Sequence, residues 1–199
     1  DVYKRQVLEK NKLDGIDLDF EWAENEKEYK DYSLAILKMR EVLGDKYLFS
    51  VSLHPVCYKI SKEAIEAVDF ISLQCYGPSP VRFPIEKYCS DIQMVLEYGI
   101  PREKLVAGVP FYGVTKDNSK KTEAYFNFVQ NGLVTSPAQN EVIYQGDTYV
   151  FDGQDNIRIK TRYAKEQKLK GMMSWDLATD LPLSDSRSLL KTMTEELRE

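Results

Sequence analysis

The sequence predicts an α/β fold in which parallel strands alternate with helices. Two observations support this class: short strand-like runs, most of them almost continuously apolar, recur along the chain, and stretches with helical spacing separate them. Strands that helices cover on both faces have this composition. We therefore expect five βα units, with strands at residues 13–20, 47–53, 69–76, 105–110 and 171–175.

The first predicted strand carries three carboxylates on one face. Asp17, Asp19 and Glu21 occupy alternate positions, and alternate side chains of a strand share a face. Neighbouring like charges repel, so this arrangement costs stability unless protons or hydrogen bonds relieve it. A solvated acidic edge strand is the alternative interpretation. Because the other face is apolar and Trp22 follows, we favour a buried strand that carries a functional site.

The next two units follow directly. Apolar residues recur at helical spacing over residues 32–43, and Gly44 ends this predicted helix. The strand at 47–53 comes next, and a short helix at 62–67 leads into the third strand. The polar face of the second strand carries Ser50, Ser52 and His54.

The last two units are separated by a longer insertion. A helix at 85–96, ended by Gly99, precedes the fourth strand. Between residues 113 and 153 the βα pattern then breaks. A helix at 156–169 precedes the fifth strand, and a helix at 186–197 closes the chain.

The insertion itself contains turn signals. We expect a helical turn near 122–130, followed by a hairpin that pairs 141–145 with 148–151. The hairpin is predicted to turn at Gly146-Asp147, since glycine and aspartate favour such tight turns.

Composition limits the function classes. The 199 residues are 43% hydrophobic and 30% charged, as in a globular protein, and the net charge is −5. This charge, without a basic cluster among aromatic residues, argues against a nucleic-acid partner. The sequence contains no apolar run of membrane-spanning length, so we expect no membrane partner.

Metal ligands and nucleophiles are scarce. Three cysteines cannot all pair, and their spacing does not match a metal site, so we expect free thiols and no metal. They are Cys57, Cys75 and Cys89. Because His54 is the single histidine, we do not favour a Ser-His-Asp triad.

The acidic strand resembles a known signature. Its pattern, Asp14-x-x-Asp17-x-Asp19-x-Glu21, matches the family 18 glycoside hydrolases, the chitinase family, at all four acidic positions. The resemblance implies that Glu21 donates a proton to the glycosidic oxygen and that Asp19 orients the substrate's N-acetyl group. It also implies that Asp17 is the partner of Asp19 and that Asp14 holds the entry of the strand.

In this family the motif lies on the fourth strand of a TIM (β/α)8 barrel. Such a barrel needs about 250 residues. We therefore expect a partial barrel, made of strands four to eight with their helices, whose first three βα units are missing. Residues 7–199 would be an incomplete catalytic domain that begins with the end of a helix. Residues 1–6 show no clear period, and we interpret them as a non-native leader.

Two further strand ends resemble the family. Gln74-Cys75-Tyr76-Gly77 is similar to the end of the sixth strand, which implies that the Tyr76 hydroxyl binds the acetamido oxygen and that Gln74 faces the substrate. Gly77 replaces the family's usual Asp or Asn. Residues 171–180 resemble the eighth strand, whose tryptophan, here Trp175, forms the floor of the reactive sugar subsite.

Three aromatic residues have two open interpretations. Residues 104–113 are similar to the family's seventh strand and put Phe111 and Tyr112 at the rim, either lining the site or packing in the core. Trp22 either lines the cleft or packs. Val114 stands where the family often has an arginine, and we expect no room after residue 113 for the α+β insertion of some members.

The resemblance implies hydrolysis of β-1,4-linked N-acetylglucosamine polymers, chitin or chitooligosaccharides. Stereochemistry would be retained because the substrate's acetamide acts as nucleophile, an exception among glycosidases, and no metal or organic cofactor is required. The alternatives are an endo-N-acetylglucosaminidase acting on N-glycans or peptidoglycan, and a non-catalytic chitinase-like carbohydrate-binding protein. The second ranks lower because Glu21 and Asp19 are both kept.

For the full-length protein we expect a monomer that is secreted, periplasmic or on the cell surface. We expect the 199-residue chain alone to be inactive, since part of the barrel would be missing.

Overall fold

The computed structural model describes residues 2–117 and 119–198, and its main feature is a five-stranded parallel sheet. The strands lie in the order β1, β2, β3, β4 and β9, each parallel to its neighbour. Their bounds are Gly15–Asp19, Leu48–Leu53, Phe70–Leu73, Leu105–Pro110 and Gly171–Trp175. All five predicted strands are present, although β1 and β3 end earlier than the sequence suggested.

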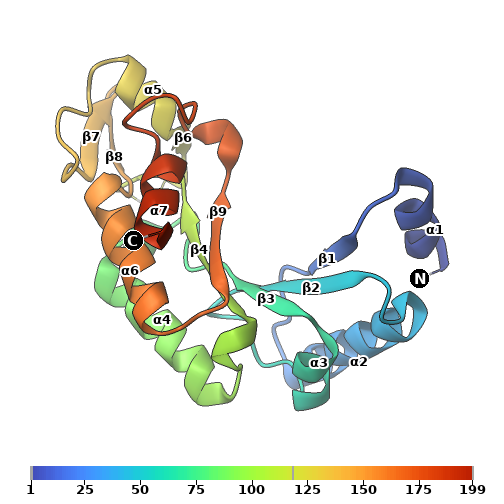
Figure 1. Ribbon diagram of the computed structural model, residues 1–199. Coiled ribbons are helices and arrows are strands. Elements are labelled where there is room, and N and C mark those ends of the chain that lie inside the picture. Colours follow the sequence, from blue (N-terminus) through green and yellow to red (C-terminus); the bar gives the residue numbers. More distant parts are fainter. Residues whose placement is uncertain (1, 118, 199) are drawn as a thin grey trace.

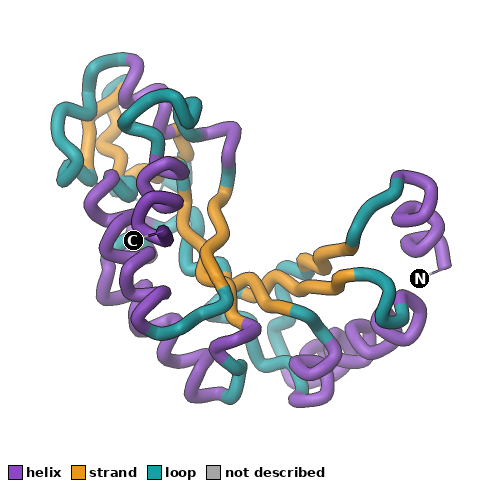
Figure 2. Tube along the Cα trace, in the orientation of Figure 1, coloured by secondary structure: helices purple, strands orange, loops and turns teal. Residues whose placement is uncertain are grey.

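Helices lie along the convex side of this curved sheet (Figures 1 and 2). The first three strands are backed by α2 and α3, β4 and β9 by α4 and α6, and α7 packs against α6. The helices are α1 Val2–Asn11, α2 Glu26–Leu43, α3 Lys62–Ala67, α4 Ile85–Tyr98, α5 Tyr125–Gln130, α6 Gln154–Glu166 and α7 Leu189–Arg198. Residues 2–6, interpreted from the sequence as part of a leader, form the first half of α1.

Local signals explain where α2 begins and ends. The Asn25 side chain accepts a hydrogen bond from the Glu28 backbone N–H at 3.1 Å, which caps the first turn. At the other end Gly44 adopts a φ of 61°, a conformation that glycine reaches without strain. The apolar stripe between these ends is buried, as its spacing predicted, through Tyr32, Ile36, Met39 and Leu43.

The core lies between the sheet and these helices. Side chains of the central strands are fully buried there, among them Phe49, Val51, Ile71 and Leu105. Burying apolar area of this kind stabilises the fold by roughly 25 cal/mol per Å². Of the three cysteines, all free as expected, Cys57 and Cys75 are buried in this layer and Cys89 is partly exposed.

The insertion after β4 forms a second, smaller sheet. Its strands are β5 Tyr112–Thr115, β6 Thr122–Ala124, β7 Glu141–Tyr144 and β8 Asp147–Val150, and their antiparallel order is β6, β5, β8, β7. With α5 they make a small α+β unit. The expectation that this stretch has no room for such a unit is therefore wrong.

The predicted hairpin is present one residue out of register. Tyr144 pairs with Asp147, so Gln145 and Gly146 form the turn instead of Gly146 and Asp147. Both turn residues have positive φ, 51° and 88°, as a two-residue turn between twisted strands requires.

Phe128 holds the small sheet to α5. Its ring lies 5.4 Å from those of Tyr149 and Phe151. A Cβ on Gly113 would come within 2.7 Å of the Phe128 ring, so glycine is required for this close approach.

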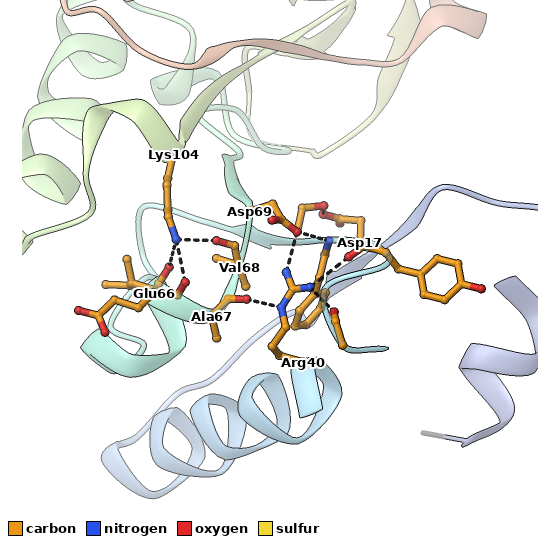
Figure 3. A network of polar contacts seen from close by, with 12 residues as sticks. Asp17, Arg40, Glu66, Ala67, Val68, Asp69 and Lys104 are labelled. Atoms are coloured by element: carbon orange, nitrogen blue, oxygen red, sulfur yellow. Dashed lines mark hydrogen bonds and ion pairs between the residues drawn. The ribbon is translucent and has the colours of Figure 1, made fainter. Parts of the chain in front are cut away.

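A polar network ties together the amino-terminal ends of β2, β3 and β4 (Figure 3). Arg40 of α2 donates to the Ala67 carbonyl at 2.7 Å and pairs with Asp69 at 2.6 Å. Asp69 also accepts the Phe49 N–H at 2.7 Å. Although burial opposes its ionisation, these hydrogen bonds hold the pKa of Asp69 below its usual value.

Lys104 makes the second half of this network. Its Nζ donates to three backbone carbonyls in the last turn of α3 and just after it, at 2.6 to 3.0 Å. They belong to Ile65, Glu66 and Val68. A single ammonium therefore satisfies the carbonyls at the end of a helix that is only six residues long.

Lys104→Met should destabilise the chain, because methionine keeps the aliphatic stem but leaves three carbonyls without their donor. We expect a loss of about 1–3 kcal/mol in the free energy of unfolding. Urea denaturation followed by circular dichroism measures it. Lys38→Met is the control, since Lys38 makes an exposed ion pair and should change stability by less than about 0.5 kcal/mol. Equal urea midpoints for the two variants would contradict the role of Lys104.

Candidate active site

A pocket of about 260 Å³ opens at the carboxyl-terminal edge of the parallel sheet. Because parallel strands end at the same edge, residues far apart in sequence meet there. Seven of the predicted site residues line it: Asp19, Glu21, Trp22, Gln74, Tyr76, Tyr112 and Trp175.

Asp17 lies on β1 two residues before Asp19 and outside the pocket. It pairs in register with Ser50, whose hydroxyl donates to its carboxylate at 2.5 Å. The Ser52 hydroxyl donates to its other oxygen at 2.8 Å. Two hydroxyl donors suit an ionised carboxylate, which only accepts hydrogen bonds. The serines of the predicted polar face thus relieve the charge of Asp17.

Asp19 has weaker support. Its carboxylate accepts only long hydrogen bonds, 3.3 and 3.4 Å, from the Gln74 amide. Burial raises the pKa of Asp19, and the charges of Glu21 and Asp17 raise it further. Protonation of Asp19 would therefore relieve part of the repulsion on this face.

Tyr76 projects across the floor of the pocket. Its hydroxyl donates to the Met173 sulfur at 3.5 Å, a weak acceptor that a ligand oxygen can displace. The ring fits because residue 108 is glycine: a Cβ there would lie 2.8 Å from the ring. Burial raises the pKa of Tyr76, so its hydroxyl stays protonated and can donate.

Two aromatic side chains complete the pocket. Trp175 ends β9 and is 56% exposed, an unusual state for an indole, with one flat face available to a ligand. Burial and the charge of Glu21 raise the pKa of Tyr112 to about 12.

Glu21 itself lies just beyond the end of β1 and is accessible to solvent.

Besides Asp17, two predicted residues lie outside the pocket. Phe111 is fully buried in the core, because the chain bends between β4 and β5 and turns its ring inward. Of its two interpretations, the structure therefore supports packing. Asp14 precedes β1, and its carbonyl accepts the Leu48 N–H at 2.9 Å, which ties the entry of β1 to β2.

His54 and Gly77 line the pocket although the sequence analysis gave them no role there. His54 follows β2 and is 7% exposed, and its ring centroid lies 4.6 Å from that of Trp22. A Cβ on Gly77 would lie 3.7 Å from His54 Nε2, so a side chain would fit. The alternation that placed Ser50 and Ser52 on the polar face also reaches His54, and this signal could have identified it.

Within residues 2–117 and 119–198, no three His, Cys, Asp or Glu side chains are arranged to hold a metal ion. Over the same residues no helix has the length and apolar character needed to cross a membrane.

Sequence comparisons find a family and its members. The pattern described as "Glycosyl hydrolases family 18" matches residues 3–180. Probable chitinase 2 of Drosophila melanogaster is 23% identical, over 87% of this chain and 49% of its own length. The chain spans about half the length of the curated relatives it matches.

Solved structures share the fold. The chitinase ChiB from the chitin utilization locus of Flavobacterium johnsoniae has a TM-score of 0.77 at 27% identity, covering 96% of this chain and 62% of that one. A chitinase-like agglutinin from Robinia pseudoacacia has a TM-score of 0.72 at 18% identity, covering 96% and 70%. At that identity the second likeness concerns the fold alone.

Asp19→Asn should stabilise the chain at pH 7. The pKa of Asp19 is higher in the folded chain than in the unfolded one, so the folded state binds more protons between the two values, and the free energy of unfolding falls as pH rises through that window. The amide removes this cost, and the gain should vanish below the ordinary pKa of 3.8. Thermal unfolding at pH 7 and pH 3 measures it.

Asp17→Asn is the matched comparison and should have the opposite sign. In the amide one of the two carboxylate oxygens becomes an NH2 donor, so one of the serine hydroxyls loses its acceptor. We expect a loss of about 1 kcal/mol, or about 2–4 °C in melting temperature. If both variants shifted the melting temperature in one direction, the difference in hydrogen-bond support between Asp17 and Asp19 would not control their stability effects.

Proposed function

The chain belongs to family 18 of the glycosyl hydrolases, and on that premise we propose that it hydrolyses β-1,4-linked N-acetylglucosamine polymers, with chitin and chitooligosaccharides as substrates. The observation that carries the proposal is one pocket that combines Asp19 and Glu21 with a tyrosine hydroxyl and an exposed tryptophan face. Relatives named as chitinases support the substrate class.

In the proposed mechanism the substrate supplies the nucleophile. The acetamido oxygen attacks the anomeric carbon while the glycosidic bond breaks, and the leaving oxygen takes the proton of Glu21. The product of this step is a cyclic oxazolinium. Water then attacks the same carbon and gives its proton to Glu21, so the configuration is retained.

Asp19 and Tyr76 have separate tasks in this scheme. Asp19 accepts or shares the acetamide N–H proton and so orients and polarises the group, which its raised pKa supports. Tyr76 donates its hydroxyl to the acetamido oxygen, replacing its weak contact with the Met173 sulfur. Asp17 is held beside Asp19 by hydrogen bonds from two serines. Gln74 holds the Asp19 carboxylate from the next strand but one.

The aromatic side chains bind the sugar. Trp175 is proposed to form the floor under the reactive ring, since the C–H faces of sugars pack on flat aromatic surfaces. Trp22 and Tyr112, which line the same pocket, would contact the same sugar or its neighbour.

We assign the five parallel strands to strands four to eight of a (β/α)8 barrel. Their parallel order, the outer layer of helices and a pocket at the carboxyl edge support this assignment. Because such polymers are too large to cross a membrane, we propose that the protein acts as a monomer outside the cytoplasm, secreted, periplasmic or at the cell surface.

Carbohydrate binding without hydrolysis is the second candidate function, and the fold shared with an agglutinin favours considering it. A binding protein has no need of a proton donor, whereas this pocket keeps Glu21 beside Asp19. N-glycans and peptidoglycan stay alternative substrates, since they carry the same acetamido group.

Glu21→Gln should reduce hydrolysis by at least about 10²-fold, because the amide keeps the shape but cannot donate the proton. Release of reducing ends from a chitooligosaccharide measures it, in the protein of the natural reading frame that contains these 199 residues. Glu24→Gln is the control: Glu24 is exposed and lies outside the pocket. Calorimetry should show that sugar binding survives in both. Normal turnover by Glu21→Gln would rule out Glu21 as the acid.

The 199-residue chain by itself should be inactive and self-associating. Among the described residues, β1 has a strand partner on one side only, and apolar side chains beside that open edge are exposed, including Leu13 and Phe20. One wall of the cleft is therefore open to water. Size-exclusion chromatography with an activity assay tests this: a monomeric, active chain would contradict it.

A further inference from the structure

His54 is the single histidine of the sequence. Its backbone N–H and carbonyl and both of its ring nitrogens take part in hydrogen bonds. Its backbone exchanges hydrogen bonds with Cys57, at 2.7 and 3.3 Å, which forms a tight turn after β2. Its ring is buried and lies against the indole of Trp22 at the pocket.

The hydrogen bonds of the ring select one tautomer. The Val56 backbone N–H donates to Nδ1 at 3.2 Å, so Nδ1 carries no proton. Nε2 lies 3.1 Å from the Tyr76 carbonyl oxygen, which can only accept. Nε2 therefore bears the hydrogen, and the neutral imidazole links the turn after β2 to the end of β3.

We propose that His54 is a positioning residue: its neutral imidazole holds the Tyr76 backbone through Nε2 and the Trp22 ring through an edge-on contact, with the ring planes 61° apart, and so fixes both sides of the substrate pocket. The part that concerns turnover rests on the proposed function. His54 itself does not transfer protons in this role, because both ring nitrogens are occupied by backbone groups.

The charges around the ring favour the neutral form. Arg82 precedes α4, and Lys87 and Asp91 lie on that helix; the two cations oppose protonation of His54 and Asp91 favours it. Both cations are paired with Asp91, which weakens its pull on the imidazole. Asp19 and Glu21 line the same pocket as His54. Burial, followed by the charge of Arg82, lowers the pKa of His54 to about 4.

Tryptophan fluorescence tests the geometry without any substrate. In Trp175→Phe the single remaining indole is Trp22, in contact with His54, and a protonated imidazole would quench it. Between pH 8 and pH 5, where circular dichroism confirms the fold, we expect no transition in Trp22 emission. A transition centred near the ordinary histidine pKa of 6.5, and abolished by adding His54→Gln, would overturn the proposal.

A pair of substitutions tests the effect on turnover. Glutamine can place an N–H donor near the position of Nε2 and reach the Tyr76 carbonyl, whereas asparagine is too short and keeps only a group near Nδ1. We expect His54→Asn to lower kcat by about 10²-fold and His54→Gln to stay within about tenfold of the parent protein, since small displacements of positioned groups cost this much.

The two results are read separately. Equal kcat values for His54→Gln and His54→Asn would overturn the link to Tyr76, provided that the parent protein hydrolyses chitooligosaccharides. If the parent does not, the proposed function fails, and the same pair is compared by calorimetric binding of a chitooligosaccharide. There the asparagine variant should bind at least about tenfold more weakly than the glutamine variant, and equal affinities would overturn the positioning role.

Discussion

The register of the five parallel strands is the constraint on which the candidate site depends. Because Asp17 pairs with Ser50 and Asp19 with Ser52, both serines lie within reach of the Asp17 carboxylate, which accepts a hydrogen bond from each. The same register continues to β9, where Pro110 pairs with Trp175. A slip of one residue in β1 would turn Asp17 and Asp19 toward the helices and remove the serine donors of Asp17. Both the stability of the fold and the set of side chains in the pocket therefore depend on this register.

Stability and function occupy opposite ends of this sheet. At the amino-terminal end, Arg40, Asp69 and Lys104 meet with opposite charges and satisfied carbonyls (Figure 3). At the carboxyl-terminal end, Asp19 and Glu21 have like charges and face an open pocket. The first arrangement lowers the free energy of the folded state and the second raises it. Barrel enzymes tolerate this division because the loops at one end are free to vary while the strands stay fixed.

Much of the fold was predictable because its signals are local. Helical spacing and strand alternation need only neighbouring residues, and they identified all five parallel strands and the acidic face. The small sheet was missed beyond its hairpin, since strands of three or four residues carry little periodicity. The sequence left Phe111 open between lining the site and packing in the core, because the direction of its ring depends on the bend after β4. The contacts of His54 come from Trp22 and Tyr76, far apart in sequence, and no local pattern reports them.

The distribution of hydrogen-bond donors explains how three neighbouring acidic residues can differ. Asp17 receives two hydroxyl donors, Asp19 one distant amide, and Glu21 faces solvent at the pocket. The donors decrease from the interior of the strand toward its end, so negative charge is best supported at Asp17 and a proton is best accommodated further along. A reaction that needs a fixed negative charge next to a group that gains and loses a proton can therefore use carboxyl groups for both roles. The hydrogen-bond donors on the neighbouring strands determine which carboxyl group takes which role.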